Sequence, residues 1–150
     1  MATDSNTATE PLELTVFSVG ELFCALDNAS VREISGMRPV TVVHHAPGHV
    51  RGVVNLRGQI MTVLDLGVRF GIGAVPDDRK ARILVVRAGS EDVGLIVDSV
   101  EDVLNADERD LEPPPSNLGG VSGTFFRAIL KQKDDLVGIV DMDRLLDDGT

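Results

Sequence analysis

The chain has 150 residues, 43% of them hydrophobic, which is typical of one globular domain or of two small ones that share a core. Only 3% of the residues are aromatic and the formal net charge is −10, so base stacking, binding to a phosphate backbone and attraction to anionic membranes are all disfavoured. We therefore expect no nucleic-acid partner and no direct membrane insertion. The first 75 residues contain five basic and seven acidic side chains and the last 75 contain nine and seventeen, so most of the acidic excess lies in the second half.

Residues 1–11 are polar and lack both the basic segment and the apolar stretch of a secretion signal, so we expect a disordered tail. No later stretch approaches the roughly 20 apolar residues of a membrane span. The single cysteine, Cys24, excludes an internal disulfide and favours a reducing compartment. Because Cys24 lies within an apolar run, we interpret it as a buried thiol rather than a nucleophile. These features predict a cytoplasmic protein.

From residue 12 onward, short β-branched segments alternate with glycines and polar turns, which indicates strands and hairpins. A first hairpin is predicted over residues 14–26, with its turn at Gly20-Glu21, and a second over residues 83–97. Each hairpin is followed by an Asp and a short apolar-acidic segment, residues 31–34 in one case and 100–103 in the other. Later in each half, an apolar strand ends on an Asp, Asp65 or Asp141, and a short helix-like stretch follows it. We expect these two carboxylates to cap the helices.

This recurrence predicts two similar halves, residues 12–75 and 81–148, within one domain that covers residues 12–148. Halves of about 65 residues are near the lower limit for independent stability, so they are expected to pack on a shared apolar interface. The fold class predicted is mainly β, with two small barrels and a few short helices. Residues 110–123 contain three consecutive prolines and are expected to form an irregular loop in the second half.

Residues 51–66, RGVVNLRGQIMTVLDL, are predicted to form two apolar strands joined by a tight turn at Arg57-Gly58. This run, with FSVGELFCALDNASVREI before it and VGLIVDSVEDVL after it, resembles the CheW family of chemotaxis coupling proteins, and the resemblance extends from Thr15 to Leu146. It implies two five-stranded SH3-like β-barrels. It also implies a non-catalytic adaptor between the cytoplasmic tips of methyl-accepting chemoreceptors and the regulatory domain of a CheA-type histidine kinase. Such an adaptor is recruited to receptor arrays at the inner face of the membrane, where other CheW-like domains are further candidate partners.

The candidate partner-binding residues come from the family's V-x-E-I and NLRG segments and a nearby glycine: Val31, Glu33, Ile34, Gly52, Asn55, Leu56, Arg57 and Gly58. The resemblance associates the Arg and the Glu with coupling, and it implies an apolar groove between the barrels for the helical receptor tip. From the residues alone, Arg57 is equally a solubilising charge or a partner for Asp65. Val31 and Ile34 would share a face on a helical turn, where they would either pack in the core or line the groove.

His44, His45 and His49 form a cluster that could in principle hold zinc. Pro47 and Gly48 interrupt any helix through them, so a loop with incidental histidines is favoured, and we expect no catalytic residue, metal or cofactor. Two alternative functions stay open. One is a CheW-like adaptor of a non-flagellar pathway that controls surface motility or a second messenger. The other is a small metal-dependent hydrolase that uses the histidines with Asp65.

Overall fold

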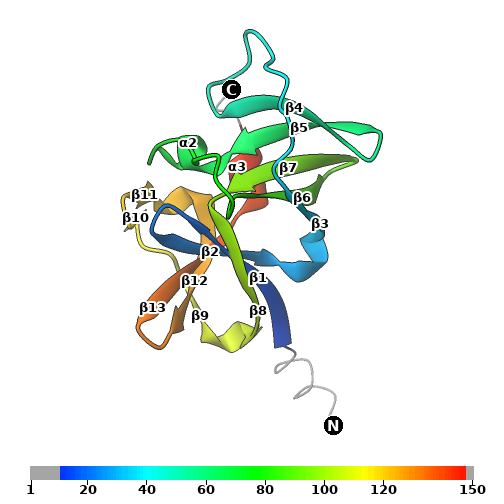
Figure 1. The fold of residues 1–150 in the computed structure, drawn as a ribbon. Coiled ribbons are helices and arrows are strands. Elements are labelled where there is room, and N and C mark those ends of the chain that lie inside the picture. The colour runs from blue at the N-terminus through cyan, green and yellow to red at the C-terminus, as the bar shows by residue number, and fades with distance from the viewer. Residues whose placement is uncertain (1–10, 148–150) are drawn as a thin grey trace.

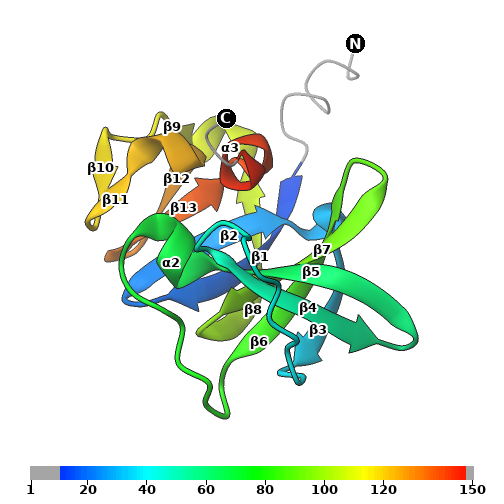
Figure 2. The ribbon, with the colours of Figure 1, turned by 90° about the horizontal axis from the view of Figure 1, so that it is seen from above.

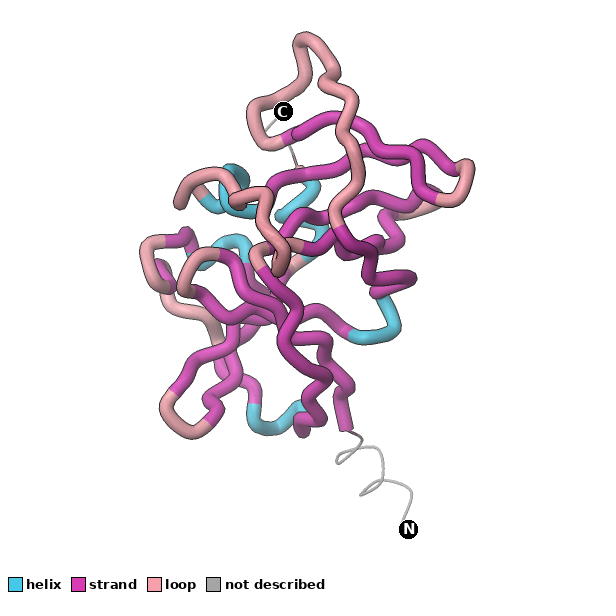
Figure 3. Tube along the Cα trace, in the orientation of Figure 1, coloured by secondary structure: helices cyan, strands magenta, loops and turns pink. Residues whose placement is uncertain are grey.

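The computed structural model describes residues 11–147, and the predicted N-terminal tail lies outside the described residues except for Pro11, which begins the first strand. Strands make up most of the fold (Figures 1 and 3). They are β1 (Pro11–Val19), β2 (Leu22–Asp27), β3 (Val31–Gly36), β4 (Val50–Leu56), β5 (Gln59–Asp65), β6 (Arg82–Ala88), β7 (Glu91–Val97), β8 (Ser99–Asp107), β9 (Leu111–Glu112), β10 (Asn117–Leu118), β11 (Val121–Ser122), β12 (Phe126–Gln132) and β13 (Asp135–Val140). The helices are α2 (Leu66–Phe70) and α3 (Met142–Leu146), with 3₁₀ turns η1 (Asn28–Ser30), η2 (Glu108–Asp110) and η3 (Gly123–Phe125). Among the described residues, no helix is long and apolar enough to cross a membrane.

Two sheets account for most of the strands, which confirms the mainly β prediction. The first sheet has five strands in the order β3-β6-β7-β5-β4, and the second has six in the order β8-β1-β2-β13-β12-β9. The strands β10 and β11 form a separate ribbon. Both predicted hairpins are present, as the antiparallel pairs β1·β2 and β6·β7. The six-stranded sheet exceeds the expected five strands because the loop after η2 adds β9 at its edge.

The two sheets are built by an exchange of hairpins between the two halves of the chain. Hairpin β1–β2 comes from the first half but lies between β8 and β13, whereas hairpin β6–β7 comes from the second half but lies between β3 and β5 (Figure 2). The predicted halves, residues 12–75 and 81–148, therefore repeat in sequence but do not correspond to the sheets. Sequence pattern identifies strands and turns, whereas the choice of a distant strand partner depends on packing that the pattern does not contain.

Cutting the chain between Asp78 and Arg79 is expected to give two fragments that do not fold separately. Each fragment lacks the hairpin that occupies the middle of its own sheet, so its remaining strands would have unpaired edges inside a barrel. Circular dichroism and urea titration should find no cooperative transition in either fragment alone, and a cooperative transition should return when they are mixed. Cooperative unfolding of a single fragment would contradict the exchange.

Three apolar clusters hold the fold together. One is formed by side chains of the first sheet and includes Val54, Val63 and Ile83. A second is formed by side chains of the other sheet and includes Leu14 and Ile139. The third draws on both sheets, and we call it the shared cluster: Phe17, Val19, Cys24, Leu26, Leu64, Leu66, Phe70, Leu84, Val86, Leu95, Val97, Leu118, Val121, Phe126, Ile129, Val140 and Leu145. This burial removes apolar surface of both sheets from water, so each sheet stabilises the other.

Cys24 belongs to the shared cluster and its side chain is fully buried. Burial disfavours the thiolate and raises the pKa of the Cys24 thiol far above its usual range. A thiol reagent such as dithionitrobenzoate is therefore expected to label the protein only as fast as it unfolds, and immediately in denaturant. Rapid labelling of the native protein would contradict the burial of this residue.

Candidate functional site

The NLRG segment forms the tip of the β4–β5 hairpin. Arg57 and Gly58 have φ values of +57° and +80°, the pattern of a two-residue turn that follows the twist of the strands. The Asn55 side-chain oxygen accepts a hydrogen bond of 2.9 Å from the Gly58 N–H, and Leu56 is buried in the first sheet's cluster. Asn55, Leu56 and Gly58 thus hold the tip in shape, and their contact with a partner stays a prediction.

Arg57 and Glu33, the two candidates associated with coupling, are brought together. The Arg57 guanidinium lies 3.0 Å from a carboxylate oxygen of Glu33, which joins the hairpin tip to β3. The Arg57 side chain is 76% exposed and that of Glu33 is 28% exposed, so the pair faces solvent mainly through the arginine. The alternative pairing of Arg57 with Asp65 is wrong, because Asp65 pairs with Arg51 instead.

Ile60 is a further residue of this tip that was not among the candidate partner-binding residues. It lies on β5, three residues after Arg57, and its side chain is 69% exposed. The alternation in β5 between the buried Met61 and Val63 and their exposed neighbours is the signal that could have found it. We call Glu33, Arg57 and Ile60 the tip surface: a charged pair, and an exposed aliphatic side chain three residues from Arg57 along the same hairpin.

Gly52 closes the barrel of the first sheet. It has a φ of +148°, and a Cβ atom there would lie 2.1 Å from the Thr41 carbonyl oxygen. This close approach allows Thr41 and Val53 to exchange two backbone hydrogen bonds of 2.9 Å, which tie the segment after β3 to β4. The geometry gives Gly52 a structural role, and a direct contact with a partner stays a prediction.

Val31 and Ile34 lie on a β-strand, so the helical turn considered for them is wrong, yet they do share a face. Val31 is opposite Val86 and Ile34 is opposite Leu84, with a bulge that inserts one extra residue between them. Val86 and Leu84 both belong to the shared cluster, and residues directly opposite in an antiparallel pair point to the same side. Val31 packs against that cluster, whereas Ile34, on the same side of the sheet, is 46% exposed.

The second half of the chain repeats this arrangement on β8. Val100 is opposite Phe17 and Val103 is opposite Thr15, again with a bulge between the two pairs. Val100 packs against the shared cluster and Val103 is 50% exposed. We call Val31, Ile34, Val100 and Val103 the margin residues. The internal repeat of segments 31–34 and 100–103 is the sequence signal that could have added the last two.

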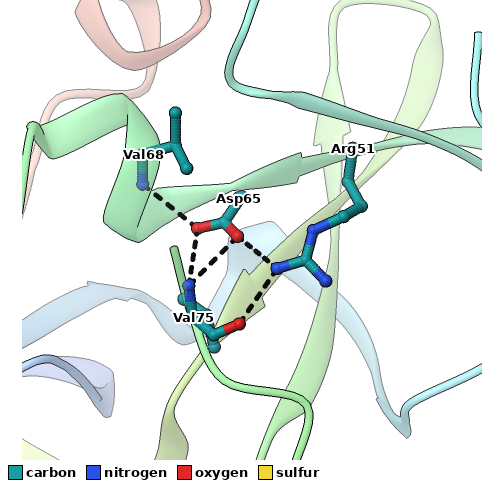
Figure 4. Close-up of polar contacts among 4 residues, drawn as sticks. All are labelled: Arg51, Asp65, Val68 and Val75. Atoms are coloured by element: carbon teal, nitrogen blue, oxygen red, sulfur yellow. Dashed lines mark hydrogen bonds and ion pairs between the residues drawn. The ribbon is translucent and has the colours of Figure 1, made fainter. Parts of the chain in front are cut away.

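A buried ion pair lies behind the hairpin, where β5 passes into α2 (Figure 4). Asp65 is 1% exposed, and its carboxylate accepts hydrogen bonds from Arg51 and from the N–H groups of Val68 at 3.1 Å and Val75 at 3.1 and 3.2 Å. Arg51 also donates to the Val75 carbonyl at 3.0 Å. The predicted cap is confirmed, but Arg51 was missed, because its partner is 14 residues away and its position depends on a bulge in β4.

The predicted cap at Asp141 is also confirmed, since its carboxylate accepts a hydrogen bond of 3.2 Å from the Arg144 N–H. His44, His45 and His49 lie in the loop between β3 and β4. Within residues 11–147, no group of three or more His, Cys, Asp or Glu side chains could hold a metal ion. With Asp65 held by Arg51, the hydrolase alternative has no assembled site in the described part of the chain.

Comparison with known proteins gives consistent results. The family model described as a CheW-like domain matches residues 13–150. The chemotaxis protein CheW of Rhizobium meliloti is 35% identical over 131 residues, which are 87% of this chain and 84% of that protein. Protein FrzA of Myxococcus xanthus is 30% identical over 108 residues, 72% of this chain and 66% of that protein.

A solved structure extends the similarity from sequence to fold. The crystal structure of the scaffolding protein TtCheW from Thermoanaerobacter tengcongensis superimposes with a TM-score of 0.84 at 34% identity, covering 91% of this chain and 88% of that one. With the interleaved sheets, the NLRG hairpin and the family match in agreement, the chain belongs to the CheW-like family of non-catalytic chemotaxis adaptor proteins.

Proposed function

We propose that this adaptor couples the cytoplasmic tips of methyl-accepting chemoreceptors to the regulatory domain of a CheA-type histidine kinase and thereby controls kinase activity. The observation that carries the proposal is the ion pair between Arg57 and Glu33, because Glu33 lies on β3, the strand that also carries Val31 and Ile34. An adaptor needs two surfaces for two partners, and this strand contributes side chains to both the tip surface and the margin residues. Recruitment to receptor arrays at the inner face of the membrane, with other CheW-like domains as neighbours, follows from the same proposal.

The margin residues suit an amphipathic receptor helix. They are aliphatic and lie along two edge strands; Val31 and Val100 pack against the shared cluster, and Ile34 and Val103 are exposed on the same strands. A helix binds such a surface by burying its own apolar face, and each fully buried aliphatic side chain contributes about 1.5–3 kcal/mol. The tip surface suits a folded partner instead, because it combines an exposed arginine with an exposed isoleucine on a projecting hairpin. We assign it to the kinase regulatory domain.

Strand β3 offers a physical route between the two surfaces. Ile34 lies on the side of the sheet that faces the shared cluster, whereas the neighbouring Glu33 lies on the other side and reaches Arg57. A receptor helix that displaces Val31 or Ile34 would move the same backbone that carries Glu33. The expected consequence is a change in the position of Arg57, and so in contact with the kinase, without any chemical step.

Co-elution from a sizing column tests the two binary interactions. The purified protein is mixed separately with a chemoreceptor cytoplasmic fragment and with a kinase regulatory domain, and each mixture is expected to elute earlier than its components. Failure of either partner to co-elute with the adaptor at about 100 μM would contradict the proposal, since interfaces of ordinary size have Kd values from micromolar to picomolar.

Charge introduced at the margin should separate the two partners. Ile34→Asp or Val103→Asp is expected to weaken receptor binding at least about tenfold, because a carboxylate would be desolvated under the helix. Kinase binding should change less than twofold. Both residues are already partly exposed, so the fold should tolerate the change. Leu136→Asp, an exposed aliphatic position at the β12–β13 turn, is the matched control. Isothermal titration with each partner gives the affinities, and equal losses for all three variants would contradict the assignment.

A second candidate is the same adaptor chemistry in a non-flagellar chemosensory pathway. The similarity to Protein FrzA, which extends over 72% of this chain, supports this second candidate. Genes for receptors and a kinase next to flagellar genes would support the first candidate, whereas a neighbourhood devoted to surface motility or second-messenger enzymes would support the second.

A further inference from the structure

Arg69 joins the two sheets at a place that neither the tip surface nor the margin residues include. It lies on α2, which follows the first sheet's β5, and its guanidinium reaches the carboxyl end of α3, which follows the second sheet's β13. It donates to the carbonyl of Leu145 at 2.8 Å, to that of Arg144 at 3.0 Å and to that of Asp147. The last carbonyls of a helix have no partner within it, so a cation placed there stabilises the helix end.

An aromatic group surrounds this contact. The Arg69 guanidinium carbon lies 4.9 Å from the centre of the Phe125 ring, and the neighbouring Phe70 ring lies 5.3 Å from Phe125 and 5.7 Å from Phe126. A planar guanidinium can lie over an aromatic ring while its N–H groups, which point outward in the guanidinium plane, donate hydrogen bonds elsewhere. We call Arg69, Phe70, Phe125 and the end of α3 the clasp.

The clasp and the margin residues border the same shared cluster. Phe70, Phe126 and Leu145 are members of that cluster, and Val31 and Val100 pack against it. In both ribbon views α2 and α3 lie close together, whereas β3 lies away from α2 (Figures 1 and 2). Because a packed core transmits displacement rather than absorbing it, a change of spacing at the clasp would alter the spacing at the margin.

We propose that Arg69 is a positioning residue for receptor binding: it fixes the angle between the two sheets and so keeps the margin residues at the spacing that a receptor helix requires. This rests on the proposed function. Arg69 touches neither partner in this account. Without Arg69 the two sheets would sample several angles, only some of which bind the receptor helix. The apparent affinity for the receptor would then be the intrinsic affinity multiplied by the fraction of molecules at a binding angle.

The test uses the full chain as the unaltered protein and as Arg69→Ala, Arg69→Lys and the control Arg144→Ala. The control removes an exposed neighbouring cation whose side chain has no hydrogen bond or ion pair within residues 11–147, while its backbone carbonyl still accepts from Arg69. Spin labels at Ser90→Cys and Asp134→Cys, on exposed turns of the two sheets, report the distance between the sheets by pulsed electron resonance. Titrations with the receptor fragment and with the kinase regulatory domain report the two affinities.

Arg69→Ala is expected to broaden the distance distribution and to weaken receptor binding about tenfold, which corresponds to a competent fraction of about one tenth. Kinase binding should change less than twofold, and Arg144→Ala should match the unaltered protein. Arg69→Lys retains the charge but not the planar set of donors, so it should also broaden the distance distribution and weaken receptor binding. If Arg69→Ala fails to fold, Arg69→Lys provides the test in its place.

An unchanged distance distribution in both Arg69 variants, or equal losses of receptor and kinase affinity, would overturn the proposal. Absence of receptor binding by the unaltered chain would overturn the proposed function, and with it the role of Arg69 in receptor binding. The two failures are distinguishable because the distance measurement needs no receptor.

Discussion

Replacing Asp65 by alanine is expected to lower the free energy of unfolding by about 3–5 kcal/mol, because it leaves the Arg51 guanidinium without its partner in a partly buried site. The same change removes the acceptor for the N–H groups of Val68 and Val75. Those two bonds begin α2 and fix the segment that leads toward β6. Urea denaturation followed by circular dichroism measures the loss.

The chain contains its own control for this variant. Asp141 occupies the equivalent position in the second half and caps α3 through one bond to the Arg144 N–H, but it is only half-buried. Asp141→Ala should therefore cost about 1 kcal/mol, the usual value of a lost helix cap. Equal costs for the two variants would mean that Arg51 adds nothing to the role of Asp65.

Replacing Arg57 by alanine is expected to weaken binding of the kinase regulatory domain about tenfold, since arginine is one of the residue types enriched among those that dominate interfaces and the Arg57 side chain is 76% exposed. Stability should change by less than about 0.5 kcal/mol, because the side chain is mostly exposed. Glu33→Ala should have a smaller effect on binding, and it should have none in the Arg57→Ala background if Glu33 acts by orienting Arg57. Calorimetric titration of the two single variants and the double variant measures this coupling.

A matched ion pair on the second sheet separates this effect from a general change of charge. Arg109 lies 2.9 Å from Asp107, with side chains 66% and 23% exposed, close to the values for Arg57 and Glu33. Hydrogen bonding to Arg109 lowers the pKa of Asp107, so this control pair is ionised at neutral pH. Arg109→Ala should leave kinase binding unchanged. A loss equal to that of Arg57→Ala would remove the argument for the tip surface.

Features set by neighbours in the chain were predictable from the sequence. The hairpins follow from glycines at turns between apolar strands, and the caps at Asp65 and Asp141 follow from a carboxylate at the start of a short helix. The turn at Arg57-Gly58 is of the same kind. Each of these depends on contacts within a few residues, which is the range over which sequence pattern carries information.

Features that depend on distant partners were not predictable in the same way. The exchange of hairpins between sheets leaves the local sequence pattern of both halves unchanged, so that pattern alone divides the chain into two halves near residue 75. The bulge in β3 puts Val31 and Ile34 on one face despite a spacing that suits a helix. The pairing of Arg51 with Asp65 and of Arg69 with α3 likewise requires the tertiary fold.

We propose that the adaptor binds a receptor and a kinase at the same time through different surfaces. Light scattering on a mixture of the protein, the receptor fragment and the kinase regulatory domain, separated on a sizing column, measures this directly. The account predicts one species whose mass equals that of a complex with all three components, and loss of the kinase domain alone with Arg57→Ala. Two binary complexes in competition, with either partner displacing the other, would contradict it.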